Sequence, residues 1–277
     1  FDVQPHLDHN VWEIERREIF AKSWVMVGLD HDLSRPGDYI TEDVAGWPIF
    51  VQRTDNGLIA FHNVCPHRAG PIVWEGGGHQ PNLVCRYHGW AFDKQGALIN
   101  ARDFGADAPP GACLSAVRAQ VWRGFVFVCL DPTTPDLMEW LGDFPAFCEA
   151  YPSDGYRFHS RTVRRMAMNW KIYNDNFLEG YHVPLVHPGM SRNIEAVSYR
   201  VEHHGDPRWN IHTAPQRDGV NWSGVWGYFY PLFSFDIFPG GMAVERWLPV
   251  GKDRTDLIFE YFRSEERRVG KECRSRW

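Results

Sequence analysis

Two short stretches, Cys65-Pro66-His67 and Cys85-Arg86-Tyr87-His88, are separated by seventeen residues, and each offers one cysteine and one histidine. Thiolate and imidazole groups are ligands for zinc and for iron–sulfur clusters. Structural zinc sites more often pair two cysteines in one loop and two histidines in the other. One cysteine and one histidine from each loop suit a cluster whose two irons take different ligand types. We therefore predict an iron–sulfur site here, with a structural zinc site as the alternative.

A second group of ligand-type residues follows Asn169, which predicts the N-cap of a helix. At about 100° per residue, Asp175, Glu179 and His182 share one face of such a helix. An aromatic stripe predicted to pack on the core occupies the other face: Trp170, Tyr173, Phe177 and Tyr181.

His187 lies about 140° from His182 around a regular helix, so an unbroken helix would keep the two rings apart. Pro184 and Pro188 supply a break that lets His187 turn back. Two histidines and a carboxylate on one side of an iron leave positions open for O2 and substrate. The pattern therefore indicates a non-haem Fe(II) site, the alternative being two ordinary histidines at a helix end.

Both motifs resemble those of one family. C-P-H-R-A-G-P (65–71) and C-x-Y-H-G-W (85–90) are similar to the cluster-binding loops of Rieske non-haem iron oxygenase large (alpha) subunits. The pattern NWK-x3-DN-x-LEGYH-x-PL-x-HPG (169–189) most resembles members that act on quaternary ammonium compounds, such as choline or carnitine monooxygenases. The family usually carries Asp where this chain has Glu179. The resemblance covers about residues 8–262.

The resemblance implies an α+β chain, in which a small antiparallel β Rieske domain precedes a helix-grip catalytic domain made of an antiparallel sheet and a long helix. We expect a helical arm at residues 1–29, a Rieske [2Fe-2S] domain at 30–150 and an incomplete mononuclear-iron domain at 151–262. Periodicity agrees, with a helix over 8–24 capped by Asp8 or Asn10. Strand-like runs follow at 225–238, 242–248 and 256–262.

The resemblance also assigns residues to cofactors. The [2Fe-2S] ligands would be Cys65, His67, Cys85 and His88. The mononuclear Fe(II) ligands would be His182 and His187, and the catalytic acids would be Glu179 and Asp175. Electrons would come from NAD(P)H only through a reductase, with or without a ferredoxin. In a homotrimer, Glu179 would bridge His88 of one subunit and His182 of the next.

In the family, a carboxylate from a later helix completes the iron site. Here the recognisable sequence ends at Phe262, and no acid before it lies in a matching motif: Asp236, Glu245, Asp253, Asp256 and Glu260. Residues 263–277, RSEERRVGKECRSRW, resemble the translation of a sequencing-library adapter. We expect a non-native tail on a truncated chain that lacks its third ligand, the alternative being a basic disordered tail.

Aromatic residues predict either a pocket on the second sheet or core filling: Trp222, Trp226, Tyr228, Tyr230, Phe233 and Phe235. Aromatic walls suit a quaternary ammonium through cation–π contacts and a planar ring through stacking. We predict O2-dependent hydroxylation of a small organic substrate, favouring a quaternary or methylated amine. The alternatives are aromatic-ring dioxygenation and, in other classes, a Rieske electron carrier without catalysis or a zinc-stabilised binding protein.

Composition excludes some functions. The 277 residues carry a formal charge of −6 with both signs mixed, so we expect no nucleic-acid partner. No apolar run reaches about eighteen residues and no signal peptide stands out, so we expect no membrane span and a cytoplasmic location. Three cysteines without nearby ligand partners are predicted to be buried hydrophobic residues: Cys113, Cys129 and Cys148.

Overall fold

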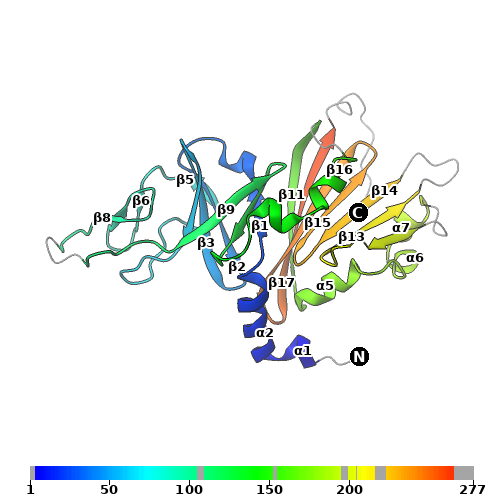
Figure 1. The fold of residues 1–277 in the computed structure, drawn as a ribbon, viewed down its shortest axis with the longest axis horizontal. Helices are drawn as coiled ribbons and strands as arrows, with labels where there is room; N and C mark the ends of the chain where they lie inside the picture. Colours follow the sequence, from blue (N-terminus) through cyan, green and yellow to red (C-terminus); the bar gives the residue numbers. More distant parts are fainter. Residues whose placement is uncertain are drawn as a thin grey trace. The chain divides into compact units, whose positions relative to one another are not determined.

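The computed structural model describes residues 4–104, 109–151, 155–194, 199–203, 205–215 and 223–264. The chain divides into two compact units, which are described separately (Figure 1). The first comprises residues 1–140 and 249–252, and the second comprises 141–248 and 253–277. Trp222 and tail residues 265–277 lie outside the described residues, so the expectations for them stay predictions.

The first unit opens with α1 (Gln4–Leu7), α2 (His9–Glu15) and a π-helical turn, η1 (Arg16–Phe20). Asp8 caps α2, because its carboxylate accepts a 2.7 Å hydrogen bond from the backbone N–H of Asn10. The helical segment ends at Phe20, four residues earlier than the helix predicted over 8–24. Residues 25–29 form a strand, so the helical arm expected over 1–29 is wrong in its last five residues.

Antiparallel strands make up most of the first unit. One seven-stranded sheet has the order β1-β10-β9-β4-β3-β2-β5 and a smaller sheet has the order β6-β7-β8. The large sheet contains β1 (Val25–Leu29), β2 (Asp38–Val44), β3 (Trp47–Thr54), β4 (Gly57–His62), β5 (Gly77–His79), β9 (Ala116–Trp122) and β10 (Phe125–Cys129), with η2 (Asp30–Leu33) between β1 and β2. The small sheet contains β6 (Leu83–Val84), β7 (Ala91–Phe92) and β8 (Leu98–Asn100).

The second unit is built on another seven-stranded antiparallel sheet, of order β11-β17-β16-β15-β14-β13-β12. Its strands are β11 (Tyr156–Met166), β12 (Arg200–His203), β13 (Trp209–Ala214), β14 (Gly224–Phe229), β15 (Phe233–Phe238), β16 (Gly241–Gly251) and β17 (Arg254–Ser264). The helices are α4 (Phe144–Cys148), α5 (Trp170–Asn176), α6 (Val183–Val186) and α7 (Pro188–Ser191), with α3 (Leu137–Leu141) at the junction of the units. The α+β class and the antiparallel sheets are confirmed.

Side chains on this second sheet alternate between its two faces. On one face, Phe144 of α4 packs against Trp209, Phe229 and Phe235. On the other face, Phe177 stacks against Tyr228 and Trp247, with ring centroids 5.9 and 5.5 Å apart. We call this second face, which carries α5 and the residues that follow it, the helix-side face.

The long helix expected after Asn169 is wrong. Asn169 does cap it, accepting a 3.0 Å hydrogen bond from the Lys171 N–H, but α5 ends at Asn176. Glu179 and His182 therefore do not share a helix face with Asp175. The Phe177 carbonyl accepts from His212 Nε2, and glycine at 180 allows Tyr199 to pack closely, because a Cβ there would lie 2.4 Å from its ring. Tyr181, expected in the buried stripe, is 90% exposed.

The remaining expectations of burial are partly met. Cys129 and Cys148 are buried as predicted, whereas Cys113 is exposed. Within the described ranges, no helix is both long and apolar enough to cross a membrane.

Candidate metal centres

The two Cys/His loops of the first unit close with the same hydrogen bonds. In the first loop, the Cys65 N–H donates to the Gly70 carbonyl and the Ala69 N–H donates to the Cys65 carbonyl, both at 2.9 Å. In the second loop, Cys85 donates to Trp90 and Gly89 donates to Cys85, both at 2.8 Å. This equivalence presents one cysteine and one histidine from each loop in matching positions.

Glycine permits the close approach of the loops. A Cβ on Gly70 would lie 2.9 Å from the Tyr87 Cβ and 3.3 Å from the Cys85 Sγ. Gly89 has φ +76°, a left-handed conformation that glycine adopts without strain. Ala69, at the equivalent position of the first loop, has φ +55°. Glycine therefore shapes both loops, through close approach at Gly70 and backbone conformation at Gly89.

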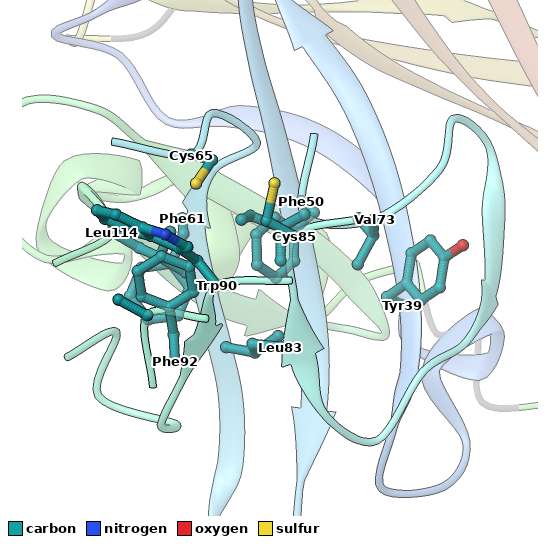
Figure 2. Close-up of a cluster of buried hydrophobic side chains, with 12 residues drawn as sticks. Tyr39, Phe50, Phe61, Cys65, Val73, Leu83, Cys85, Trp90, Phe92 and Leu114 are labelled. Carbon is teal, nitrogen blue, oxygen red and sulfur yellow. The ribbon is translucent and has the colours of Figure 1, made fainter. Parts of the chain in front are cut away.

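The four predicted ligands gather at one place. The sulfur atoms of Cys65 and Cys85 face each other over the hydrophobic core of the unit (Figure 2). Both cysteines are 2% exposed, and burial raises the pKa of the Cys65 thiol. The rings of His67 and His88 lie 4.7 Å apart. Desolvation lowers the pKa of His67, which favours the neutral form that binds metal.

Trp90 supplies a test of whether a cluster fits. Its ring stacks on His67 at 4.5 Å with an interplanar angle of 4°. Trp90 is 2% exposed, and its Nε1–H has no acceptor among the described residues. A buried donor of this kind normally has a partner. A cluster sulfur held by the two loops would supply one, so the residues fit a [2Fe-2S] group. The sequence pattern C-x-Y-H-G-W contained this tryptophan but did not indicate the stacking.

In the second unit, Glu179 and His182 form a hydrogen-bonded pair. Nδ1 of His182 lies 2.6 Å from Oε1 of Glu179, and the other carboxylate oxygen accepts hydrogen bonds from the backbone N–H groups of Tyr181 and His182. Burial opposes ionisation of Glu179, but these hydrogen bonds outweigh it and lower its pKa. Because Nδ1 donates to an ionised carboxylate, Nε2 of His182 is left as the atom that can bind a metal.

His187 lies beside His182, with ring centroids 5.2 Å apart. Its backbone adopts φ −117° and ψ 59° between α6 and α7, which breaks the helix where the prolines predicted a break. Desolvation first, and then the charge of His182, lower the pKa of His187. The structure therefore brings the two predicted iron ligands together, and desolvation favours the neutral imidazole of His187.

A hydrogen-bond network that the sequence analysis missed supports this loop. The Tyr199 hydroxyl lies 2.6 Å from His212 Nδ1, and His212 Nε2 lies 2.8 Å from the Phe177 carbonyl. Since a carbonyl only accepts, Nε2 carries the proton and Nδ1 accepts from Tyr199. Asn210 donates to the same carbonyl at 2.8 Å. The motif at 169–189 could not indicate this network, because Tyr199 precedes β12 and His212 and Asn210 lie on β13, outside the motif.

The predicted catalytic acid Asp175 is exposed on α5. Among the other acids considered for the iron, Glu260 is buried and paired with Arg161 at 2.9 Å. Asp236 and Glu245 form a pair with each other under α5. In the part of the chain that the structure describes, no three His, Cys, Asp or Glu side chains gather so that they could hold a metal ion. No third iron ligand is therefore assigned.

Comparison with known proteins agrees with this geometry. Residues 23–112 match the model of the Rieske [2Fe-2S] domain, and residues 153–222 match that of the ring-hydroxylating alpha subunit catalytic domain. The carnitine monooxygenase oxygenase subunit of Escherichia coli K12 is 32% identical over 94% of this chain and 74% of its own length. The chloroplastic choline monooxygenase of Atriplex hortensis is 28% identical over 90% of this chain and 59% of its own length.

A crystal structure described as a quaternary ammonium Rieske monooxygenase superposes with a TM-score of 0.86 at 27% identity, covering 96% of this chain and 76% of that one. Paired Cys/His loops on one β unit and a Glu–His–His set on a second define a two-centre, iron-dependent oxygenase. The chain belongs to the family of Rieske non-haem iron oxygenase large (alpha) subunits. Its cofactors are a [2Fe-2S] cluster and a mononuclear iron, and its electrons come from a reductase.

Proposed function

We propose that this oxygenase component hydroxylates a quaternary or methylated amine. The observation that carries the proposal is the relative named above, a carnitine monooxygenase subunit that is similar over 94% of the chain. Choline and glycine betaine monooxygenases are also similar. The runner-up, aromatic-ring dioxygenation, rests on naphthalene 1,2-dioxygenase at 21% identity, which supports the fold alone.

Four residues would hold the cluster: Cys65, His67, Cys85 and His88. The chain's own contribution is to hold the two loops in matching closed conformations, with Gly70 of the first loop against Tyr87 and Cys85 of the second. His182 and His187 would hold the iron. Bound there, a reduced iron supplies the O2 activation that hydroxylation requires.

Glu179 keeps the His182 proton on Nδ1 and so aims the free ring nitrogen. Tyr199 and His212 keep the backbone at Phe177 in place, and that backbone leads into Glu179. We propose these as positioning roles. Asp175, exposed on α5, keeps only its predicted role as a catalytic acid.

Electron delivery would run between subunits. The similar quaternary ammonium monooxygenase is one whose crystal structure reveals inter-subunit electron transfer in that protein. We propose a homotrimer in which Glu179 bridges His182 and a cluster histidine of the neighbouring subunit, with a reductase and, in some systems, a ferredoxin as electron donors. The cytoplasmic location stays a prediction.

The test is a substrate panel with purified protein, a Rieske reductase and NADH. Carnitine, choline, glycine betaine and naphthalene are supplied separately, and product is measured against O2 consumed. We expect coupled product formation from at least one methylated amine. Coupled oxidation of naphthalene alone would contradict the proposal. Visible absorption and electron spin resonance of the same preparation separate a cluster from zinc.

A further inference from the structure

Three polar side chains lie together on the helix-side face of the second sheet. Ser234 and Asp236 alternate along β15, and Glu245 on β16 is the register partner of Ser234. Register partners point to the same face, so all three face α5. Ser234 is fully buried and Asp236 is 4% exposed. Polar groups are therefore concentrated where a sheet interior is normally apolar.

Part of this group lacks hydrogen-bond partners. Asp236 and Glu245 bond to each other, and the Tyr173 hydroxyl donates to Glu245. The hydroxyl oxygen of Ser234 and Oδ1 of Asp236 have no partner among the described residues. Burying a polar group without a partner destabilises the fold. Two such groups on one patch of sheet point to a ligand that satisfies them.

Aromatic rings flank the same patch. On β14, Trp226 is the register partner of Asp236 and Tyr228 is the partner of Ser234. On the other side, the register partner of Asp236 is Ala243, whose side chain is small and apolar. An organic cation that has lost its hydration water binds favourably to carboxylate oxygens and to the faces of aromatic rings.

Burial raises the pKa of both Asp236 and Glu245, because two carboxylates side by side in a dry environment resist ionisation. The groups that face them are Tyr173 from α5, Tyr199, Arg164 from β11 and Tyr261 from β17. The tyrosines stay protonated near neutral pH, since the pKa of each is raised. Arg164 is the cation in this group, and its charge acts on Glu245.

We propose that Asp236, Glu245 and Ser234, with Trp226 and Tyr228, bind the cationic methylated-ammonium group of the substrate. This rests on the proposed function, and it names the residues that select the charge. A quaternary ammonium has no N–H to donate, so it is recognised through its charge and its polarised methyl groups. Carboxylates supply the charge, the rings supply π faces, and the Ser234 oxygen accepts weak C–H contacts.

Two members of the patch, Glu245 and Trp226, are partly exposed, whereas Ser234, Asp236 and Tyr228 are buried.

The test compares two ligands that differ in charge alone. Choline and its neutral carbon isostere 3,3-dimethyl-1-butanol have the same shape, and their binding to the full chain is measured by calorimetry. We expect wild type to bind choline on the order of tenfold or more tightly than the isostere. Asp236→Asn and Glu245→Gln should each weaken choline binding about tenfold and leave isostere binding unchanged. Asp256→Asn, which removes an acid from β17 of the same sheet, is the matched control and should bind choline as wild type does.

Two failures are distinguishable. If the substrate panel gives no coupled product from any methylated amine, the proposed substrate class fails. If the panel does give such product but wild type shows no preference for choline over the isostere, the proposed function stands and this inference is overturned. If wild type prefers choline and both variants keep that preference, the proposed function stands and this inference is overturned.

A wild-type measurement covers the case in which the variants do not fold. Choline titrations in buffers of different ionisation heat should show proton release, because a bound cation favours the ionised acids. The isostere should release none. Equal proton release for both ligands, or none for choline, would overturn the inference.

Discussion

Nδ1 of His182 and Oε1 of Glu179 lie 2.6 Å apart in a stretch of chain that is not helical. The carboxylate also closes the turn by accepting from two backbone N–H groups, so one side chain both shapes the loop and orients the ring. Glutamate can do this here because the loop, rather than a helix, sets its distance to His182.

Glu179→Gln should weaken Fe(II) binding. The amide can accept from the backbone but cannot stabilise the His182 proton as an anion does, and loss of such partners typically costs 10–100-fold in metal affinity. Iron titration of the apo-protein followed by nitric oxide adduct spectroscopy measures this. Glu202→Gln, which changes an exposed acid on β12, is the control and should bind Fe(II) as wild type does. Wild-type iron affinity in the variant would show that the pair has no orienting role.

Tyr199→Phe should loosen the loop that carries Glu179. It leaves the buried His212 Nδ1 without its donor, which costs about 1–3 kcal/mol in the free energy of unfolding. Urea unfolding measures the loss. His203→Gln on β12 changes an exposed histidine and should have almost no effect. Equal stability of Tyr199→Phe and wild type would argue that the network is incidental.

Trp90→Phe should lower the reduction potential of the cluster. Phenylalanine keeps the stacking on His67 but removes the Nε1–H that lacks an acceptor among the described residues. Hydrogen bonds to cluster sulfurs help set Rieske potentials, so losing one favours the oxidised form. Protein-film voltammetry gives the potential directly. Trp122→Phe, in β9 of the same unit, is the control. A potential unchanged from wild type would mean that Trp90 donates no hydrogen bond to the cluster.

Asp236→Asn should flatten the pH dependence of stability. The folded pKa of Asp236 is raised above its unfolded value of about 3.9, so between those values the folded state binds more protons. The stabilisation is complete at low pH and is lost as pH rises through the folded pKa. The variant should therefore gain stability relative to wild type at about pH 8. The free energy of unfolding is measured by urea unfolding across a pH series, with Asp256→Asn as control. Parallel curves for Asp236→Asn and wild type would contradict a raised pKa at Asp236.

The sequence predicted the loop arrangement of the first centre better than the helix geometry of the second. Cys65 and Cys85 could be assigned to one site because each lies in a short loop. The hydrogen bonds that close such a loop join residues a few positions apart, so the local sequence is enough to predict it. The helical geometry predicted for Asp175, Glu179 and His182 failed because groups from distant segments take up the backbone that would continue the helix. The Phe177 carbonyl accepts hydrogen bonds from Asn210 and His212 of β13, contacts that depend on the order of strands in the sheet.

Strands were easier to predict than their neighbours. The aromatic runs at 225–238, 242–248 and 256–262 do form strands, because residues of this kind favour a pleated surface. Which face of the sheet each side chain occupies could not be predicted, because it depends on the register between strands. Of the residues considered for the pocket, Trp226 and Tyr228 lie on the helix-side face, whereas Phe235 packs on the opposite one. The pairing of Ser234 with Glu245 could not be read from either strand alone.

The matched closure of the two cysteine loops bears on which substitutions the first centre tolerates. Each loop is fastened by its own backbone hydrogen bonds, and a Cβ on Gly70 would lie 2.9 Å from the Tyr87 Cβ and 3.3 Å from the Cys85 Sγ. A side chain added to the first loop at Gly70 would therefore push against a predicted ligand held by the second. The two loops close independently but are constrained jointly, so the shape of one limits what the other can carry.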